Sequence, residues 1–349
     1  MKTCLSLKKI LSVLKWKTSV DPEPLTVKIN FDSKITAIGS CFSEHLSAFL
    51  KKRKFSLISN PTGIVYNPFS IAELIHDLCD KKSIDEKKLF FHQGLWHHFQ
   101  FHGKFSNRSK KAALNQMNES LQMASEHLAS SDFLILTLGT SFVFREKNGG
   151  NFVSNCHKLP SNNFSREWLS PSKIHQELST ALTRLLKIRP ALKIIFTVSP
   201  VRHIRDGLVA NNRSKSALLL AVHYLQTSMP DSVFYFPSYE IVMDELRDYR
   251  FYKEDLLHPS DQAIDYVLSK FATATLSEEA GEFCSQLEGI LRAMDHRILH
   301  PGTPDHRAFI NKQLEKIEKL RKSHPDLDFQ REWTHFEKQL KEHFDPQGH

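Results

Sequence analysis

Residue types that together perform nucleophilic catalysis occur in two distant parts of the chain. Ser40 follows the apolar run 35–38 and precedes apolar residues at helical spacing, so we expect it in a strand-to-helix turn. Asp255 and His258 lie three residues apart in a later polar turn. Such an aspartate can hold one ring nitrogen, which leaves the other to take a serine proton. Ser40 alone could be a helix N-cap and the pair a surface contact, but together they indicate a serine hydrolase.

The sequence pattern between Ser40 and Asp255 predicts an α/β fold. Apolar runs at 133–138, 193–198 and 233–236 read as buried strands, and helical patterns run through 114–128, 174–185 and 218–225. Continuous apolar strands that alternate with amphipathic helices imply a parallel sheet covered on both faces. Ligands of such folds bind beyond the carboxyl ends of the strands, where we expect Ser40. Ser70 and Ser170 are expected to cap two of the helices.

The last part of the chain has a different pattern. Apolar residues at helical spacing predict two amphipathic helices, over 310–320 and 329–340. We therefore divide the chain into an N-terminal segment (1–29), an α/β domain (30–279) and a helical appendage (280–349). The appendage is expected to pack on the core or to pair with a second copy in a homo-oligomer.

Composition excludes several classes of protein. The chain has 349 residues, 40% of them hydrophobic, and a net charge of +8 that is concentrated only at 51–54. A solvated helix end explains that cluster, so we expect no nucleic-acid partner. Five cysteines without CxxC spacing indicate reduced thiols. The N-terminal apolar stretch 5–16 is interrupted by lysines, and no segment is long enough to span a membrane. We expect a cytoplasmic protein without a membrane partner.

Four histidines crowd one segment, at His92, His97, His98 and His102. Aromatic residues alternate with polar ones from position 98 to 102, which is a strand pattern. On a strand, positions four apart are roughly 13 Å from each other, too far to share one ion. We expect no metal and no cofactor, and read the segment as a substrate-facing or packed aromatic stretch.

Several motifs, taken together and in order, resemble the GSCFA-domain family, a bacterial group assigned to the SGNH (GDSL-like) hydrolase superfamily. The resemblance covers roughly residues 30 to 270. The matching stretches are Gly39-Ser40-Cys41-Phe42, 60–68, 99–106, 136–140, 155–160, 197–203 and Asp255 to Pro259.

The resemblance implies a flavodoxin-like three-layer α/β/α sandwich and acyl-ester hydrolysis or transfer. It makes Ser40 the nucleophile, His258 the general base and Asp255 its orienting partner. The oxyanion would be held by the N–H groups of Ser40 and Gly63 and by an asparagine after a central strand. This chain has Gly139-Thr140-Ser141 in place of that asparagine, so we expect Thr140, or else Ser141 or Asn155, to substitute.

Other polar residues are candidates for lining the pocket, namely His102, Ser141, Asn155, His157, Arg202 and His203. Asn155 and His157 lie in a loop that its own hydrogen bonds could equally explain. Arg202 could bind a substrate carboxylate or phosphate, or form a structural ion pair. Cys41 is a rival nucleophile, but we expect its side chain to point away from the site and to be buried.

From these observations we expect a serine-dependent acyl-ester hydrolase, esterase- or deacetylase-like, acting on a small or carbohydrate-linked ester. Two alternatives remain open. The same triad could transfer the acyl group to another acceptor. Alternatively, the missing asparagine could mark a catalytically weakened module that binds a ligand in the same cleft.

Overall fold

A computed structural model describes residues 17–344 of the chain. Its centre is a parallel five-stranded sheet in the order β10-β9-β5-β1-β2. The strands are β1 (Lys34–Gly39), β2 (Ser56–Ser59), β5 (Phe133–Leu138), β9 (Lys193–Val198) and β10 (Val233–Tyr235). Counted along the chain, this is the flavodoxin-like order, with its topological switch between the first and third strands. The predicted central parallel sheet is confirmed.

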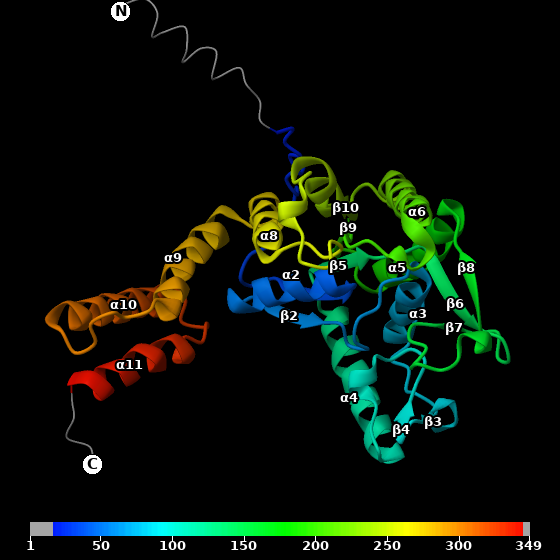
Figure 1. Ribbon diagram of the computed structural model, residues 1–349, viewed down its shortest axis with the longest axis horizontal. Helices are drawn as coiled ribbons and strands as arrows, with labels where there is room; N and C mark the ends of the chain where they lie inside the picture. The colour runs from blue at the N-terminus through cyan, green and yellow to red at the C-terminus, as the bar shows by residue number, and fades with distance from the viewer. Residues whose placement is uncertain (1–16, 345–349) are drawn as a thin grey trace, which may run out of the picture.

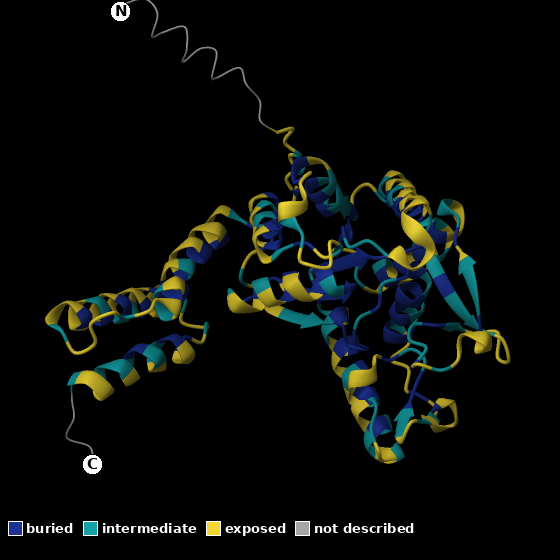
Figure 2. Cartoon of the chain, in the orientation of Figure 1, coloured by how far each residue is buried: buried dark blue, intermediate teal, exposed yellow. Residues whose placement is uncertain are grey.

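Helices cover both faces because successive side chains of a strand point to opposite sides. The helices are α2 (Cys41–Lys52), α3 (Pro68–Cys79), α4 (Lys110–Ala129), α5 (Pro171–Ile188), α6 (Gly207–Ser228) and α8 (Asp261–Thr275). In β5, Phe133 and Ile135 join the core beneath α2 and α8, and Leu134 and Leu136 join the core beneath α3 to α6. Figures 1 and 2 show these layers with the buried strands between them. The three-layer sandwich is therefore confirmed.

The start of α3 differs from the prediction. Ser70 is not the N-cap: the helix begins at Pro68, and Asn67 Oδ1 accepts a hydrogen bond from the Ser70 N–H at 2.8 Å. Asn-Pro is a strong start signal, because asparagine caps well and proline suits the first helical position. Ser170, by contrast, caps α5 as expected, with Pro171 following it.

The histidine-rich segment also differs. A hairpin joins β3 (Phe90–His92) to β4 (Leu95–His97) through Gln93 and Gly94, whose φ angles are 47° and 80°. Residues 98–102 are therefore not a strand. The chain turns there, and the Phe101 N–H donates to the His98 carbonyl at 3.0 Å. The alternation of aromatic and polar residues at 98–102 therefore belongs to a turn and not to a strand.

A second sheet, absent from the sequence predictions, follows β5. It is antiparallel, in the order β7-β6-β8, and comprises β6 (Phe142–Glu146), β7 (Phe152–Val153) and β8 (Phe164–Trp168). The remaining short elements are α7 (Ser238–Glu240), η1 (Glu86–Lys88), η2 (Gly103–Phe105), η3 (Ser161–Asn163), η4 (Ile204–Asp206), η5 (Ile241–Glu245) and η6 (Tyr249–Phe251).

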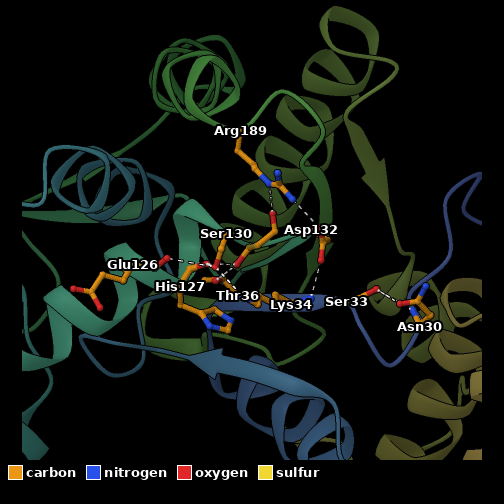
Figure 3. Close-up of polar contacts among 10 residues, drawn as sticks. Asn30, Ser33, Lys34, Thr36, Glu126, His127, Ser130, Asp132 and Arg189 are labelled. Carbon is orange, nitrogen blue, oxygen red and sulfur yellow. Dashed lines mark hydrogen bonds and ion pairs between the residues drawn. The ribbon is translucent and has the colours of Figure 1, made fainter. Parts of the chain in front are cut away.

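A polar network fixes the starting ends of the central strands (Figure 3). Asp132 accepts hydrogen bonds from the Lys34 N–H and from the Arg189 guanidinium, both at 2.9 Å. Thr36 Oγ1 and Ser131 Oγ lie 2.8 Å apart beside them. This fixes β1 in register with β5, so that Gly39 lies opposite Thr137 at the carboxyl ends.

The C-terminal residues form α9 (Glu278–Asp295), α10 (Pro304–Ser323) and α11 (Gln330–Phe344), which stand to one side of the sandwich in Figure 1. The two predicted C-terminal helices are confirmed, and the division at residue 279 stays a prediction.

No helix between residues 17 and 344 is both long and apolar enough to cross a membrane. The whole N-terminal stretch 5–16 discussed above, and residues 345–349, lie outside the described part of the chain.

Candidate active site

Ser40 lies at the switch point of the sheet, directly after β1 and before α2. A Cβ atom on Gly39 would come within 2.5 Å of the Thr137 carbonyl oxygen, so only glycine allows β1 to approach β5 this closely. The Ser40 N–H donates to that same oxygen at 3.1 Å. Its hydroxyl makes no capping bond, is buried and has no hydrogen-bond partner among residues 17–344. A simple N-cap role therefore does not explain Ser40.

The Asp255–His258 turn holds its two side chains against each other. His258 Nδ1 lies 2.6 Å from Asp255 Oδ2, and Asp255 Oδ1 accepts from the N–H groups of His258 and Leu257 at 3.0 and 2.9 Å. These backbone bonds, and then the His258 ring, lower the pKa of Asp255 to about 2. Leu256 has a φ of 58°, a conformation that costs energy for leucine and tightens the turn. The histidine is thus oriented by an ionised carboxylate.

A cavity of about 110 Å³ lies between this turn and the start of α2. Cys41 and Phe42, which follow Ser40, line it on one side, and Asp255, His258 and Lys253 line it on the other. The remaining lining residues are His45, Val201, Pro259 and Ile264. The two distant motifs are therefore brought to one small cavity.

No hydrogen bond among the described residues joins Ser40 to His258. The Ser40 Oγ is enclosed, and the His258 side chain is 47% exposed. Catalytic hydrogen bonds are often long or absent in unliganded enzymes and form when substrate binds. Proton transfer between these two residues requires them to approach.

The expected oxyanion donors are used within the protein. The Ser40 N–H bonds to Thr137, the Gly63 N–H donates to the Asn60 carbonyl at 2.8 Å, and the Thr140 N–H donates to Tyr66 at 3.3 Å. Thr140 Oγ1 lies 2.9 Å from Ser214 Oγ. None of the three positions therefore offers a free backbone donor in this state.

The other predicted pocket residues divide into two places. Asn155 Oδ1 accepts from the His157 N–H at 2.9 Å, and His157 packs beside His97 with ring centroids 4.4 Å apart. Burial lowers the pKa of His157 to about 4. His102 is exposed and lies beside Gly63. A Cβ atom added to Gly63 would come within 2.2 Å of the Cβ atom of His102. Asn155, His157 and His102 therefore lie around the turn 60–63 and the histidine-rich segment 92–102.

Ser141, Arg202 and His203 follow the central strands. Ser141 is fully buried, and its N–H and hydroxyl both bond to Ser214 Oγ, at 2.7 and 3.1 Å. Arg202 lies over the Tyr252 ring and has no acidic partner within the described residues. His203 lies 5.6 Å from the Tyr66 ring, and burial followed by the charge of Lys215 lowers its pKa to about 4.

Two residues of this region carried no signal in the sequence. Lys215 on α6 is completely buried, and its Nζ donates to the carbonyls of Gly139 and Ser199, both at 2.6 Å. These carbonyls follow β5 and β9, so Lys215 ties together the two loops behind the site. Burial lowers the pKa of Lys215 to about 7. His45, one turn into α2, lines the cavity, and burial lowers its pKa as well.

The expectation for Cys41 is wrong. Cys41 is half-buried and lines the cavity together with His258, because the first turn of α2 presents position 41, not 40, to that space. Burial raises the pKa of its thiol. An activated cysteine needs the opposite shift, toward the thiolate.

No metal site occurs in the part of the chain that the structure describes, where no three His, Cys, Asp or Glu side chains are grouped to hold an ion. A larger cavity, of about 800 Å³, adjoins Glu245 and contains none of the predicted site residues. Glu245 there is fully paired with Lys17 and Lys270.

Comparison with known protein families gives matches to two family models. The model of the GSCFA family matches residues 34–271, and that of the GSCFA domain protein C-terminal domain matches residues 287–342. No curated protein sequence is significantly similar. Among solved structures, an acetyl xylan esterase from the rumen bacterium Butyrivibrio proteoclasticus is similar over 70% of this chain, with 15% identity and a TM-score of 0.36. The chain spans 64% of that esterase's length.

Proposed function

The chain belongs to the GSCFA family, and we propose that it is a serine-dependent acyl-ester hydrolase of the SGNH type, with Ser40, His258 and Asp255 as its triad. The observation that carries the proposal is the Asp255–His258 pair, at 2.6 Å, in the small cavity that borders the Ser40–Cys41 turn. A histidine held by a carboxylate through Nδ1 is prepared to accept a proton at Nε2. An exposed ion pair without this cavity would carry no such implication.

In the proposed reaction, the Ser40 hydroxyl attacks the ester carbonyl carbon and its proton passes to His258 Nε2. The tetrahedral intermediate collapses, the bond from carbon to the leaving oxygen breaks, and His258 returns the proton to the departing alcohol. Water then attacks the acyl-Ser40 ester by the same steps in reverse. Asp255 stays ionised and stabilises the imidazolium that forms twice in each cycle.

The cavity beside the Asp255–His258 pair is small, about 110 Å³, and Ser40 itself does not line it. A small ester reaches Ser40 past this space more readily than an ester with a long acyl chain. We therefore infer an ester of a small acyl group, with the alcohol, which includes the carbohydrate-linked case, outside the cavity. Transfer to an acceptor other than water would use the same acyl-enzyme.

The test is hydrolysis of short-chain aryl esters by the wild type and by variants. Ser40→Ala and His258→Ala should abolish the release of the phenol above background, and His223→Ala, at an exposed histidine of α6, should leave it unchanged. Cys41→Ala should still form the acyl-enzyme, which separates Ser40 from its neighbour. Undiminished turnover in folded Ser40→Ala would reject the proposal.

A second function, ligand binding without catalysis, is favoured by one observation: the Ser40 hydroxyl is enclosed and the expected oxyanion donors are occupied by bonds within the protein. A module that only binds a ligand has no need of a free hydroxyl or of free oxyanion donors. Such a protein would show a saturable rise in melting temperature with short-chain esters and no acyl-enzyme.

A further inference from the structure

Asn60 has a buried side-chain amide of which only one half is used. Its Oδ1 accepts the Gly39 N–H at 2.9 Å, whereas its Nδ2 is buried and has no partner within the part of the chain that the structure describes. The orientation of the amide is determined, because the Gly39 N–H needs an acceptor and only the oxygen can supply one. The unused atom is therefore an N–H₂ donor, at a residue only 3% exposed. Buried donors without partners are rare in folded proteins and call for an explanation.

The backbone fixes Asn60 against the last residues of β1. Its N–H donates to the Ala37 carbonyl at 2.9 Å, and its carbonyl accepts from Gly63 at 2.8 Å. Its φ of 45° completes the turn that closes over the end of the strand. With the bond to Gly39, three groups of Asn60 are anchored, so its amide is held at the residue next to Ser40.

The alternatives at this edge of the sheet are mostly occupied. The N–H groups of Ser40, Gly63 and Thr140 donate to backbone carbonyls. Among the described side chains at the ends of β1, β2 and β5, the other buried groups without partners are hydroxyls, those of Ser40 itself, Thr62 and Thr137. Asn60 Nδ2 is the only amide donor left unpaired there, and an amide donates without a competing acceptor role at that atom.

We propose that Asn60 Nδ2 is the side-chain donor of the oxyanion hole, which hydrogen-bonds the ester carbonyl oxygen as that oxygen becomes negatively charged during attack by Ser40. The inference rests on the proposed function. It also relocates the donor: the family resemblance would supply an asparagine after β5, where this chain has Thr140, whereas Asn60 follows β2.

The experiment compares the second-order rate at which a fluorophosphonate modifies Ser40 in the wild type, Asn60→Asp and Asn67→Asp. Aspartate at position 60 keeps the shape and the acceptor for Gly39 and removes the donor. The rate should fall about 100- to 1000-fold, the usual loss on removing one oxyanion donor. Asn67 is the matched control, equally buried, with both halves of its amide bonded to Ser70. Asn67→Asp should react like the wild type, because aspartate also caps helices.

The outcomes separate the two proposals. A folded Asn60→Asp protein that is modified at the wild-type rate overturns the role of Asn60 and leaves the hydrolase proposal standing. A folded wild type that is not modified at Ser40 overturns both. If Asn60→Asp does not fold, a crystal structure of the phosphonylated wild type decides: Asn60 Nδ2 should lie about 2.7–3.2 Å from the phosphoryl oxygen. Contact from Thr62 or Thr137 in its place would reject the inference.

Discussion

Ser40 begins a helix without capping it, and this sets it apart from the other serines at helix starts. Ser109, Ser170 and Ser260 each accept a hydrogen bond from the first turn of their helices. The Ser40 hydroxyl is buried and unpaired, which costs about 1–3 kcal/mol relative to a satisfied group. Ser43 and Ser47 of α2 also have buried hydroxyls without a partner among the described residues, so the unpaired hydroxyl fits an available nucleophile, and it is the position at the end of β1 that sets Ser40 apart.

Asp255→Asn tests the orienting carboxylate. The amide still accepts the backbone N–H groups but no longer stabilises an imidazolium, and it favours the wrong tautomer of His258. We expect kcat for a short-chain ester to fall about 1000- to 10,000-fold with little change in KM, as in a known serine protease. Steady-state kinetics measures this, and a loss below tenfold would contradict the role of Asp255.

The lowered pKa of Asp255 also makes a prediction about pH. Because its folded value is about 2, below the ordinary 3.8, its contribution to stability is present above pH 4 and is lost as the pH falls through about 2. Asp255→Asn should therefore lose stability relative to the wild type near neutrality, and this difference should shrink to a small remainder at pH 2. Urea denaturation at both pH values checks this. A constant difference would mean that Asp255 is not specifically stabilised.

Lys215 makes a prediction of the same sign at higher pH, because burial lowers its pKa from 10.5 to about 7. Between these values the unfolded chain binds more protons than the folded one, so stability rises with pH. A neutral amine still has two N–H groups for the Gly139 and Ser199 carbonyls. The free energy of unfolding of the wild type, relative to Lys215→Met, should increase from pH 7 to about 10. Parallel curves would contradict a neutral Lys215.

At the scale of elements, the sequence predicted what depends on local pattern. Runs such as 133–138 and 193–198 are mostly apolar, which is typical of a strand covered on both faces, and Ser170-Pro171 marks a helix start directly. The hairpin 90–97 was missed because its strands are only three residues long. The histidines around its turn residues, Gln93 and Gly94, directed attention to a metal site instead of a turn.

The candidate site was predictable only where its residues form short motifs. Ser40, Asp255 and His258 stand in recognisable turns, and the structure brings both turns to one cavity. Lys215 and Asn60 act through contacts with residues distant in sequence, and their types alone suggest nothing. Whether a buried amide is paired depends on the whole fold.

The turn at Gly63 gives a test of local geometry. Gly63 has a φ of 86° and no room for a Cβ, whereas Gly94 has a φ of 80° and open space around it. Gly94→Ala should cost about 1 kcal/mol from backbone strain alone. Gly63→Ala adds a clash with His102 and should cost at least about 2 kcal/mol more. Thermal denaturation of both variants separates the two effects, and equal losses would contradict the close packing at Gly63.

At the scale of the whole molecule, the C-terminal helices share a core with the sandwich. Phe283 of α9 packs edge-on to Phe31, with ring centroids 4.5 Å apart. Glu332 of α11 is buried and accepts hydrogen bonds from the Lys54 ammonium at 2.9 and 3.1 Å. The appendage is thus attached through the end of α2, the helix that begins at the site.

A double-mutant cycle on Lys54 and Glu332 tests this attachment. Lys54→Met leaves a buried carboxylate unpaired and should cost about 3 kcal/mol. Lys54→Met combined with Glu332→Leu should recover much of that loss, because no charge is left buried. Urea denaturation provides the four values. Additive losses would show that the two side chains do not depend on each other.

The most direct test of the proposed function is fluorophosphonate labelling of the wild type and Ser40→Ala, followed by intact mass and peptide mapping. We predict one adduct, on Ser40, that is absent from the folded Ser40→Ala variant. An unlabelled but folded wild type, or an adduct that persists in Ser40→Ala, would contradict a nucleophilic Ser40.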